Sequence, residues 1–120
     1  MFLGAGLGAN ARYWLGGWIS ERWGTSFPWG TLVINVSGSA LIGLVMGVLL
    51  QTPVPIWWRL LIVIGFLGGY TTFSTFSYET LSLLMDRNYG PAALNVVAAC
   101  LLSFFGTWLG LVAARALTGA

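Results

Sequence analysis

Charge is what this sequence has least of. Charged residues make up only 7% of the 120 residues, and all five positive ones are arginines, whereas a soluble domain carries about 25% charged residues. Hydrophobic residues make up 58%, so too few charges remain to build a water-soluble surface. We therefore expect an all-α membrane protein, covered by the lipid bilayer, with one domain over residues 1–120. The arginines are scattered, which excludes the basic patch of a nucleic-acid-binding protein.

Histidine is absent, and Cys100 is the only cysteine. These absences exclude histidine acid–base chemistry, a disulfide within the chain and a Cys/His metal cluster. No set of nucleophile, base and acid is present, so the sequence does not favour an enzyme. Cys100 lies in an apolar stretch, where a free cysteine is typically a small buried hydrophobe. No basic segment precedes the first apolar residues, so we expect no cleaved signal peptide.

The apolar stretches predict four transmembrane helices, because about 20 apolar residues cross the hydrocarbon core as a helix. The expected spans cover about residues 2–19, 30–50, 56–84 and 91–114. Pro53 and Pro55 end the second span, since proline cannot continue a helix, and Pro91 suits the first turn of the fourth. Tryptophans gather near the span ends, as they do at membrane interfaces.

The third span is too long and too irregular for one straight helix. It would be roughly 43 Å long, against a hydrocarbon core of about 30 Å. Its middle holds Gly68 and Gly69 followed by a run of hydroxyl residues. We predict a break at residues 68–71, since non-helical backbone at this depth is tolerated only inside protein or beside water. The alternative is a continuous, tilted helix whose glycines make a tight contact.

Small or polar residues recur at about every fourth position on each expected helix, and so share one face. The series are Gly4, Gly8, Arg12 and Gly16; Thr31, Asn35, Ser39, Gly43 and Gly47; Thr72, Thr75 and Glu79, with Phe73 and Phe76 beside them; and Asn95, Ala99, Ser103 and Thr107. Glycine stripes let membrane helices approach closely, and packing can explain any single polar member. Polar stripes on three helices together favour a water-lined pathway or an ion site.

Arg12 and Glu79 are ionisable residues within expected spans, which makes them functional candidates. The alternative for Arg12 is that its long side chain reaches the nearer membrane surface. Glu79 has a similar alternative, because it lies two turns beyond the predicted break and can sit near the far interface.

Arginine is balanced between the two sides of the membrane. If the helices alternate in direction, Arg59 and Arg115 lie on one side, and Arg22 and Arg87 lie on the other. Bias in Lys and Arg sets the orientation of membrane proteins, so a chain without bias should insert both ways. Two copies of opposite orientation would form an antiparallel homodimer.

Three motifs carry a resemblance to a known family. They are GANARY at residues 8–13, GTLVIN at residues 30–35 followed by Gly38, and GFLGGYTTFSTFS at residues 65–77 followed by Glu79. On these motifs the chain resembles the Fluc (CrcB) family of fluoride channels, and the match covers all four spans. The resemblance implies a dual-topology dimer with two antiparallel fluoride pores.

The resemblance also implies roles for individual residues. Asn35, Phe73 and Phe76 match pore-lining residues, Ser103 and Thr107 match a hydroxyl track, and Glu79 matches a pore-associated acid. Arg12 and Thr31 match vestibule positions. Gly68 and Thr71 match positions whose backbone carbonyls hold a structural sodium ion at the dimer centre. Asn95 and Ala99 depart from the family pattern, since they stand where an aromatic residue and a serine can occur.

The chemistry of these residues suits fluoride, which is small and strongly hydrated. Its water can be replaced by amide and hydroxyl donors. The candidates are Asn35, Thr72, Thr75, Ser103 and Thr107. The positive ring edges of Phe73 and Phe76 can attract it without binding it too tightly for release. We expect a channel in the inner or plasma membrane through which fluoride leaves the cytoplasm passively, which lowers its toxicity.

Two other functions stay open at this point. A small multidrug-resistance-type transporter has a similar size and dual topology, but it needs a membrane-embedded carboxylate on its first helix, where this chain has Arg12. A structural membrane subunit needs no transport pathway, and the predicted break in the third span argues against it.

Overall fold

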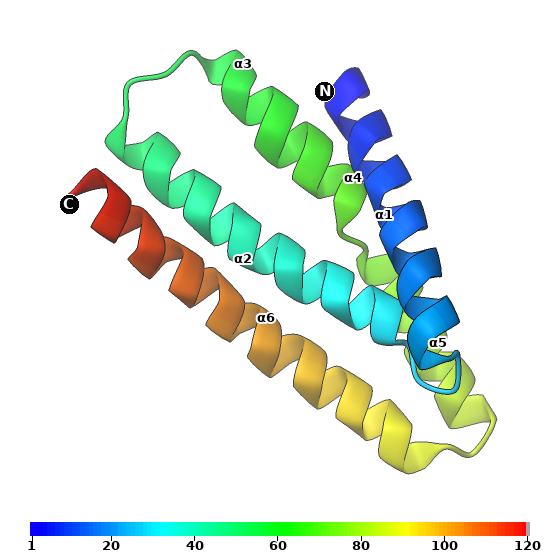
Figure 1. Ribbon diagram of the computed structural model, residues 1–120. Helices are drawn as coiled ribbons and strands as arrows, with labels where there is room; N and C mark the ends of the chain where they lie inside the picture. The colour runs from blue at the N-terminus through cyan, green and yellow to red at the C-terminus, as the bar shows by residue number, and fades with distance from the viewer. Residues whose placement is uncertain (120) are drawn as a thin grey trace.

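The computed structural model describes residues 1–119, and the regular elements in this range are all helices (Figure 1). The elements are α1 (Phe2–Trp23), α2 (Trp29–Gln51), α3 (Ile56–Arg59), the π-helix η1 (Leu60–Leu67), α4 (Gly68–Tyr70), α5 (Phe73–Met85) and α6 (Tyr89–Thr118). The predicted domain runs to residue 120, which lies outside the described residues. The helix ends fall within a few residues of the predicted spans.

The long helices alternate in direction, as the charge argument requires. Figure 1 shows the N-terminus, the connection at residues 52–55 and the C-terminal end of α6 at one end of the molecule. The connections at residues 24–28 and 86–88 lie at the opposite end. Arg59 and Arg115 therefore share one end of the bundle, and Arg22 and Arg87 share the other.

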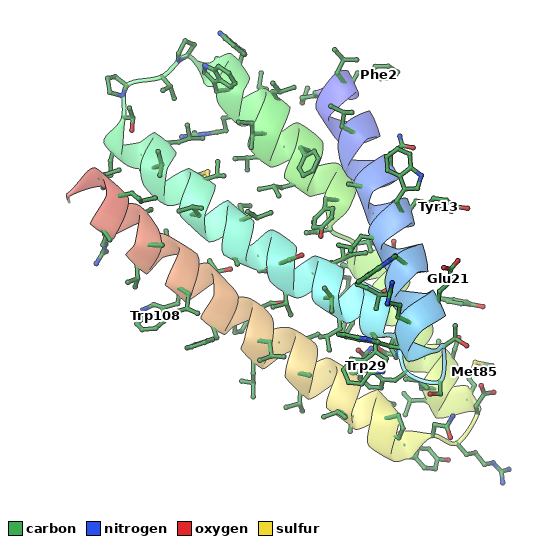
Figure 2. All side chains as sticks on the ribbon, viewed as in Figure 1. Phe2, Tyr13, Glu21, Trp29, Met85 and Trp108 are labelled. Carbon is green, nitrogen blue, oxygen red and sulfur yellow. The ribbon has the colours of Figure 1, made fainter. Side chains whose placement is uncertain are left out.

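The outer surface is apolar. Segments 29–51, 56–85 and 89–118 are each long and apolar enough to cross a membrane. Large hydrophobic side chains such as Tyr13 and Trp108 point away from the bundle (Figure 2). The remaining predicted span, which corresponds to α1, has 22 residues. It is not among the three segments that meet this measure of apolarity.

The helices form two close pairs. α2 and α6 lie side by side along most of their lengths, and α1 lies against η1 and α4 (Figure 1). The backbones come so close that a Cβ added to Gly110 would meet the Ala40 carbonyl oxygen, and one added to Gly43 would meet that of Thr107. In lipid, where helices gain no hydrophobic free energy by meeting, such close approach is a main source of attraction.

The break in the third span is real, but it lies later than predicted. Residues 68–70 are still helical, and the extended backbone is at Thr71 (ψ 157°) and Thr72 (φ −153°, ψ 118°). Gly69 has a different role, because a Cβ added there would meet the backbone of Ala5 in α1 at 2.5–3.1 Å. A Cβ added to Gly68 would meet only the Val63 carbonyl oxygen at 3.8 Å, which is an ordinary contact. The alternative of a continuous helix is excluded, and the tight glycine contact exists alongside the break.

The first half of the third span is a π-helix, which the sequence did not predict. The Gly68 N–H donates back to the Val63 carbonyl, five residues earlier, at the end of η1. The π-helix is rare and frequently occurs at functional sites. An apolar run such as residues 60–64 looks the same for an α-helix and a π-helix, so composition carried no signal for it.

Candidate functional site

Asn35 on α2 holds the break open. Its Nδ2 donates to the Thr72 carbonyl at 2.9 Å, and its Oδ1 accepts from the Thr72 N–H at 2.9 Å. The side-chain amide thus replaces the helical partners that the backbone of Thr72 has lost, as backbone at membrane depth requires. An amide nitrogen carries two hydrogens, so Asn35 keeps one N–H for a ligand.

The Thr72 side chain begins α5. Its hydroxyl oxygen accepts from the Thr75 N–H at 3.2 Å, which is a helix N-cap, and its hydroxyl donates to Thr75 Oγ1 at 3.1 Å. Threonine is a favoured N-cap residue. Because Thr75 Oγ1 accepts this hydrogen bond, its own hydroxyl proton is free to be donated elsewhere.

Phe73 and Phe76 occupy the first turns of α5. Their ring centroids are 5.6 Å apart, and the rings are tilted by 47°, within the range of favourable aromatic pairs. Phe73 is 77% exposed in the protomer, and Phe76 is half-buried. The pair therefore presents ring surface that this protomer alone does not cover.

A cavity of about 500 Å³ brings together most of the residues predicted to line a pore. Those residues are Asn35, Thr72, Phe73, Phe76 and Ser103, and the predicted sodium-site residues Gly68 and Thr71 line the same cavity. Ala99 and Cys100 complete its α6 wall. Cys100 is exposed, so the expectation of a buried cysteine is wrong. Its side chain faces out of the protomer because α6 packs through its other side.

A second cavity of about 760 Å³ lies between α1, α2 and α5. It contains four of the other predicted site residues, namely Arg12, Thr31, Thr75 and Glu79. Thr72 lines both cavities. The smaller and the larger cavity are therefore neighbours, and Thr72 with its Asn35 partner forms part of the wall between them.

Arg12 reaches across to the third span. It is half-buried, and its Nε donates to the Gly69 carbonyl at 3.2 Å. This contact places a cation at the C-terminal end of α4, where it favours the helix dipole and satisfies a carbonyl near the break. Within residues 1–119, Arg12 forms no salt bridge with Glu79.

Glu79 has a buried oxygen without a partner. Its Oε1 is shielded from solvent and accepts no hydrogen bond within the described part of the chain. Glu79 lines the larger cavity on the same helix as Thr75. A buried carboxylate oxygen without a donor is costly, so this arrangement of Glu79 does not stabilise the protomer.

The family membership is decided by the sequence as a whole. Residues 1–111 match the family model described as "CrcB-like protein, Camphor Resistance (CrcB)". The chain belongs to the CrcB-like family. The predicted family is thereby confirmed, and the three apolar segments agree with a multi-pass protein of the cell membrane.

Relatives that carry a fluoride-channel name are similar to this chain along about nine tenths of their length. The "Fluoride-specific ion channel FluC" of Geobacter sulfurreducens is 52% identical over 112 residues, which cover 92% of this chain and 90% of the relative. The protein of that name from Geobacter metallireducens is 52% identical over 110 residues, with 91% and 89% covered. That of Acidobacterium capsulatum is 50% identical over 111 residues, with 92% and 89% covered.

Two residues of this CrcB-family chain lie elsewhere than its polar stripes suggested. Thr107 lines neither cavity, and its hydroxyl donates to the Ser39 carbonyl at 3.0 Å between α6 and α2. Asn95 also lines neither cavity and is buried inside the protomer. Helical spacing put both residues on the α6 stripe, but it carried no signal for which neighbour each one meets.

Proposed function

We propose that this chain forms a fluoride-selective channel through which fluoride leaves the cytoplasm passively, which lowers fluoride toxicity. The observation that carries the proposal is the smaller cavity, which gathers Asn35, Phe73, Phe76 and Ser103 beside a helix break. The names of the CrcB-family relatives support the same ion.

The donors at the site suit a small, strongly hydrated anion. The second N–H of Asn35 and the hydroxyl of Ser103 can replace water in the smaller cavity, and the free hydroxyl proton of Thr75 can do so in the larger one. The edges of Phe73 and Phe76 add a weak positive field without a full charge. Weak contacts in series allow the ion both to bind and to leave, as conduction requires.

The larger cavity serves as the vestibule in this proposal. Arg12 and Thr31 line it, and a positive charge in a cleft raises the local concentration of anions. Thr72 lines both cavities, so an ion that passes Thr72 and Thr75 moves from the vestibule to the phenylalanines. Glu79 stands beside this path and limits how strongly the vestibule holds an anion.

A second copy of the chain in antiparallel orientation completes each pore. Two observations support this partner: Phe73 is 77% exposed in one protomer, and the arginines outside the bundle centre are divided equally between its two ends. Epitope tags on the C-terminus should then be detected on both sides of the membrane. Added lysines at one end should lower transport unless a copy with the opposite bias is co-expressed. One fixed topology in the unmodified protein would contradict the dimer.

Sodium is the cation we propose at the dimer centre, held by the carbonyl oxygens of Gly68 and Thr71. In a continuous α-helix the Thr72 N–H would donate to the Gly68 carbonyl, but here it donates to Asn35, which leaves that oxygen for a ligand. Carbonyl oxygens suit hard cations. The Thr71 hydroxyl donates to Leu67 O at 2.9 Å, and Thr71→Ser keeps it, so that variant should dimerise and transport normally.

Fluoride efflux from liposomes tests the function directly. The wild-type protein should release fluoride readily and chloride hardly at all. Phe73→Ile and Phe76→Ile remove the polarised ring edge at similar bulk, and each should cut fluoride flux strongly while the protein still folds and dimerises. Phe105→Ile is the matched control, because Phe105 is 54% exposed and lines neither cavity. Equal fluoride and chloride fluxes, or full flux without both pore phenylalanines, would refute the proposal.

The same assay separates the two alternatives. A structural subunit would release neither ion. A proton-coupled drug transporter would need an embedded carboxylate on α1, but the acid of that helix is Glu21, which lies exposed in its last turns (Figure 2).

A further inference from the structure

Asn95 is a polar residue buried inside the protomer. It is 2% exposed and is the one buried polar residue within residues 1–119. Its burial is complete within one protomer, and it lines neither cavity. Polar side chains at membrane depth are costly and need partners, so the partner of Asn95 indicates what the residue does.

The partner of Asn95 lies on the helix that carries the phenylalanines. Asn95 Nδ2 donates to Thr80 Oγ1 at 2.9 Å, and Thr80 Oγ1 donates to the Phe76 carbonyl at 2.8 Å. A hydroxyl has only one proton, and here Phe76 takes it. Thr80 must therefore accept from Asn95, and the two hydrogen bonds form a relay that runs in one direction from α6 to the backbone of Phe76.

Few other polar contacts hold α5 in place. At its start, α5 is tied to α2 through the pair of Thr72 and Asn35. Farther along, the bond between Asn95 and Thr80 is the one side-chain hydrogen bond between α5 and α6 in the described residues. Phe73 and Phe76 lie between these two attachments, so the rotation and depth of their rings depend on both.

We infer that Asn95 is a positioning residue for ion selection, which acts on Phe76 through Thr80 and does not touch the ion. This inference rests on the proposed channel function. It assigns to Asn95 a role outside the pore lining, although its spacing places it on the same stripe as Ser103. The physical reason is that α5 must hold two rings at a fixed tilt, and the surrounding lipid offers no hydrogen bonds that would fix the rotation of this helix.

A double-mutant cycle in liposomes tests this assignment. Asn95→Ala and Thr80→Val each break the relay, and each should lower fluoride flux per reconstituted dimer by about tenfold, because a misplacement of about 1 Å can cost up to about 100-fold. The double variant should be no worse than either single one, because both changes remove the same relay. If Asn95 instead met the ion directly, Asn95→Ala would lower flux by the same factor with or without Thr80→Val, and the inference would be wrong.

A second readout separates positioning from loss of folded protein. Fewer folded channels would lower the maximal flux but leave the half-saturating fluoride concentration and the fluoride-to-chloride ratio unchanged. Displaced rings should raise the half-saturating concentration or lower that ratio. An unchanged concentration and ratio in both single variants would overturn the assignment.

Two matched variants serve as controls. Thr80→Ser keeps a hydroxyl that can both accept from Asn95 and donate to Phe76, so it should restore flux to within about twofold of wild type. Asn10→Ala removes an amide hydrogen bond of similar length, 2.8 Å to Gly6 O on the exposed side of α1, and should change nothing. If Asn95→Ala does not fold, the comparison of Thr80→Val with Thr80→Ser decides, since equal flux in these two would refute the relay.

The same measurements distinguish failure of the proposed channel function from failure of the role inferred for Asn95. Absence of fluoride flux in the wild-type protein would refute the proposed function. Normal wild-type flux with additive single variants would refute only the role of Asn95.

Discussion

The contact between α2 and α6 and the break between α4 and α5 are built in opposite ways. α2 and α6 meet backbone to backbone, with Gly110 against Ala40 and Gly43 against Thr107. At the break, the Asn35 side chain holds the backbone of Thr72 through two hydrogen bonds of 2.9 Å. Close backbone packing joins α2 and α6, whereas side-chain hydrogen bonds stabilise the break.

The difference follows from the solvent. Lipid gives helices no hydrophobic reason to associate, so a permanent helix pair depends on close packing over a long contact. Lipid also offers no hydrogen bonds, so backbone that leaves the helix must find partners inside the protein. We therefore expect steric changes in the first region to abolish folding, and polar changes in the second region to abolish transport in a protein that still folds.

The largest expected effect is that of Gly110→Val. The new side chain would meet the Ala40 carbonyl and the Leu44 N–H, and backbone cannot move aside as a side chain can. Overpacking typically costs about 1–3 kcal/mol or more, so we expect little monodisperse protein after purification. Gly90→Val is the control, because nothing lies within 4 Å of a Cβ at Gly90. Equal yields of the two variants would contradict the steric account.

The next effect in size is that of Asn35→Leu. Leucine has a similar volume, but it leaves the N–H and C=O of Thr72 without partners, at a cost of about 1–3 kcal/mol for each unsatisfied group. We expect a folded protein with a lower melting temperature and no measurable fluoride efflux. Asn10→Leu, on the exposed side of α1, should stay within about 0.5 kcal/mol of wild type. Wild-type efflux from Asn35→Leu would show that the break does not depend on this side chain.

Thr72→Val tests a smaller part of the same region. The variant removes the N-cap of α5 but keeps the backbone bonds to Asn35, and loss of such a cap costs about 1 kcal/mol. We expect reduced flux and a modest fall in thermal stability, both restored in Thr72→Ser, whose hydroxyl can cap the helix again. If Thr72→Ser is as impaired as Thr72→Val, a hydroxyl at residue 72 is not sufficient and loss of the cap does not explain the effect.

The smallest effect is expected for Thr107→Val, a polar change placed in the packed region. It removes one hydrogen bond to Ser39 O, and such bonds between membrane helices are worth about 0.6 kcal/mol on average. Fluoride flux should stay close to wild type, since Thr107 lines neither cavity. A strong loss of flux would instead show that Thr107 lines the pore, as the family resemblance implied.

Prediction from sequence succeeded where one residue pattern was enough. Low charge, long apolar stretches and paired prolines indicated a helical membrane protein, and the three motifs indicated its family. The break was predicted at residues 68–71, from the two glycines and the run of hydroxyl residues that follows, and the structure has it at Thr71 and Thr72. The N-cap chemistry of Thr72 and Thr75 was visible in the sequence and would have placed it better. The π-helix at residues 60–67 had no compositional signal.

The sequence by itself determined the class of protein, the helix order and the face on which each polar residue lies, because composition and a 3.6-residue period act locally. Only the tertiary structure decided which neighbour each face meets. Asn35 pairs with Thr72, 37 positions away in the chain. Asn95 on α6 turns inward to Thr80, and Thr107 on α6 meets Ser39 on α2. All three are polar residues at helical spacing, and they differ in role because helix packing in lipid is set by the summed fit of whole surfaces.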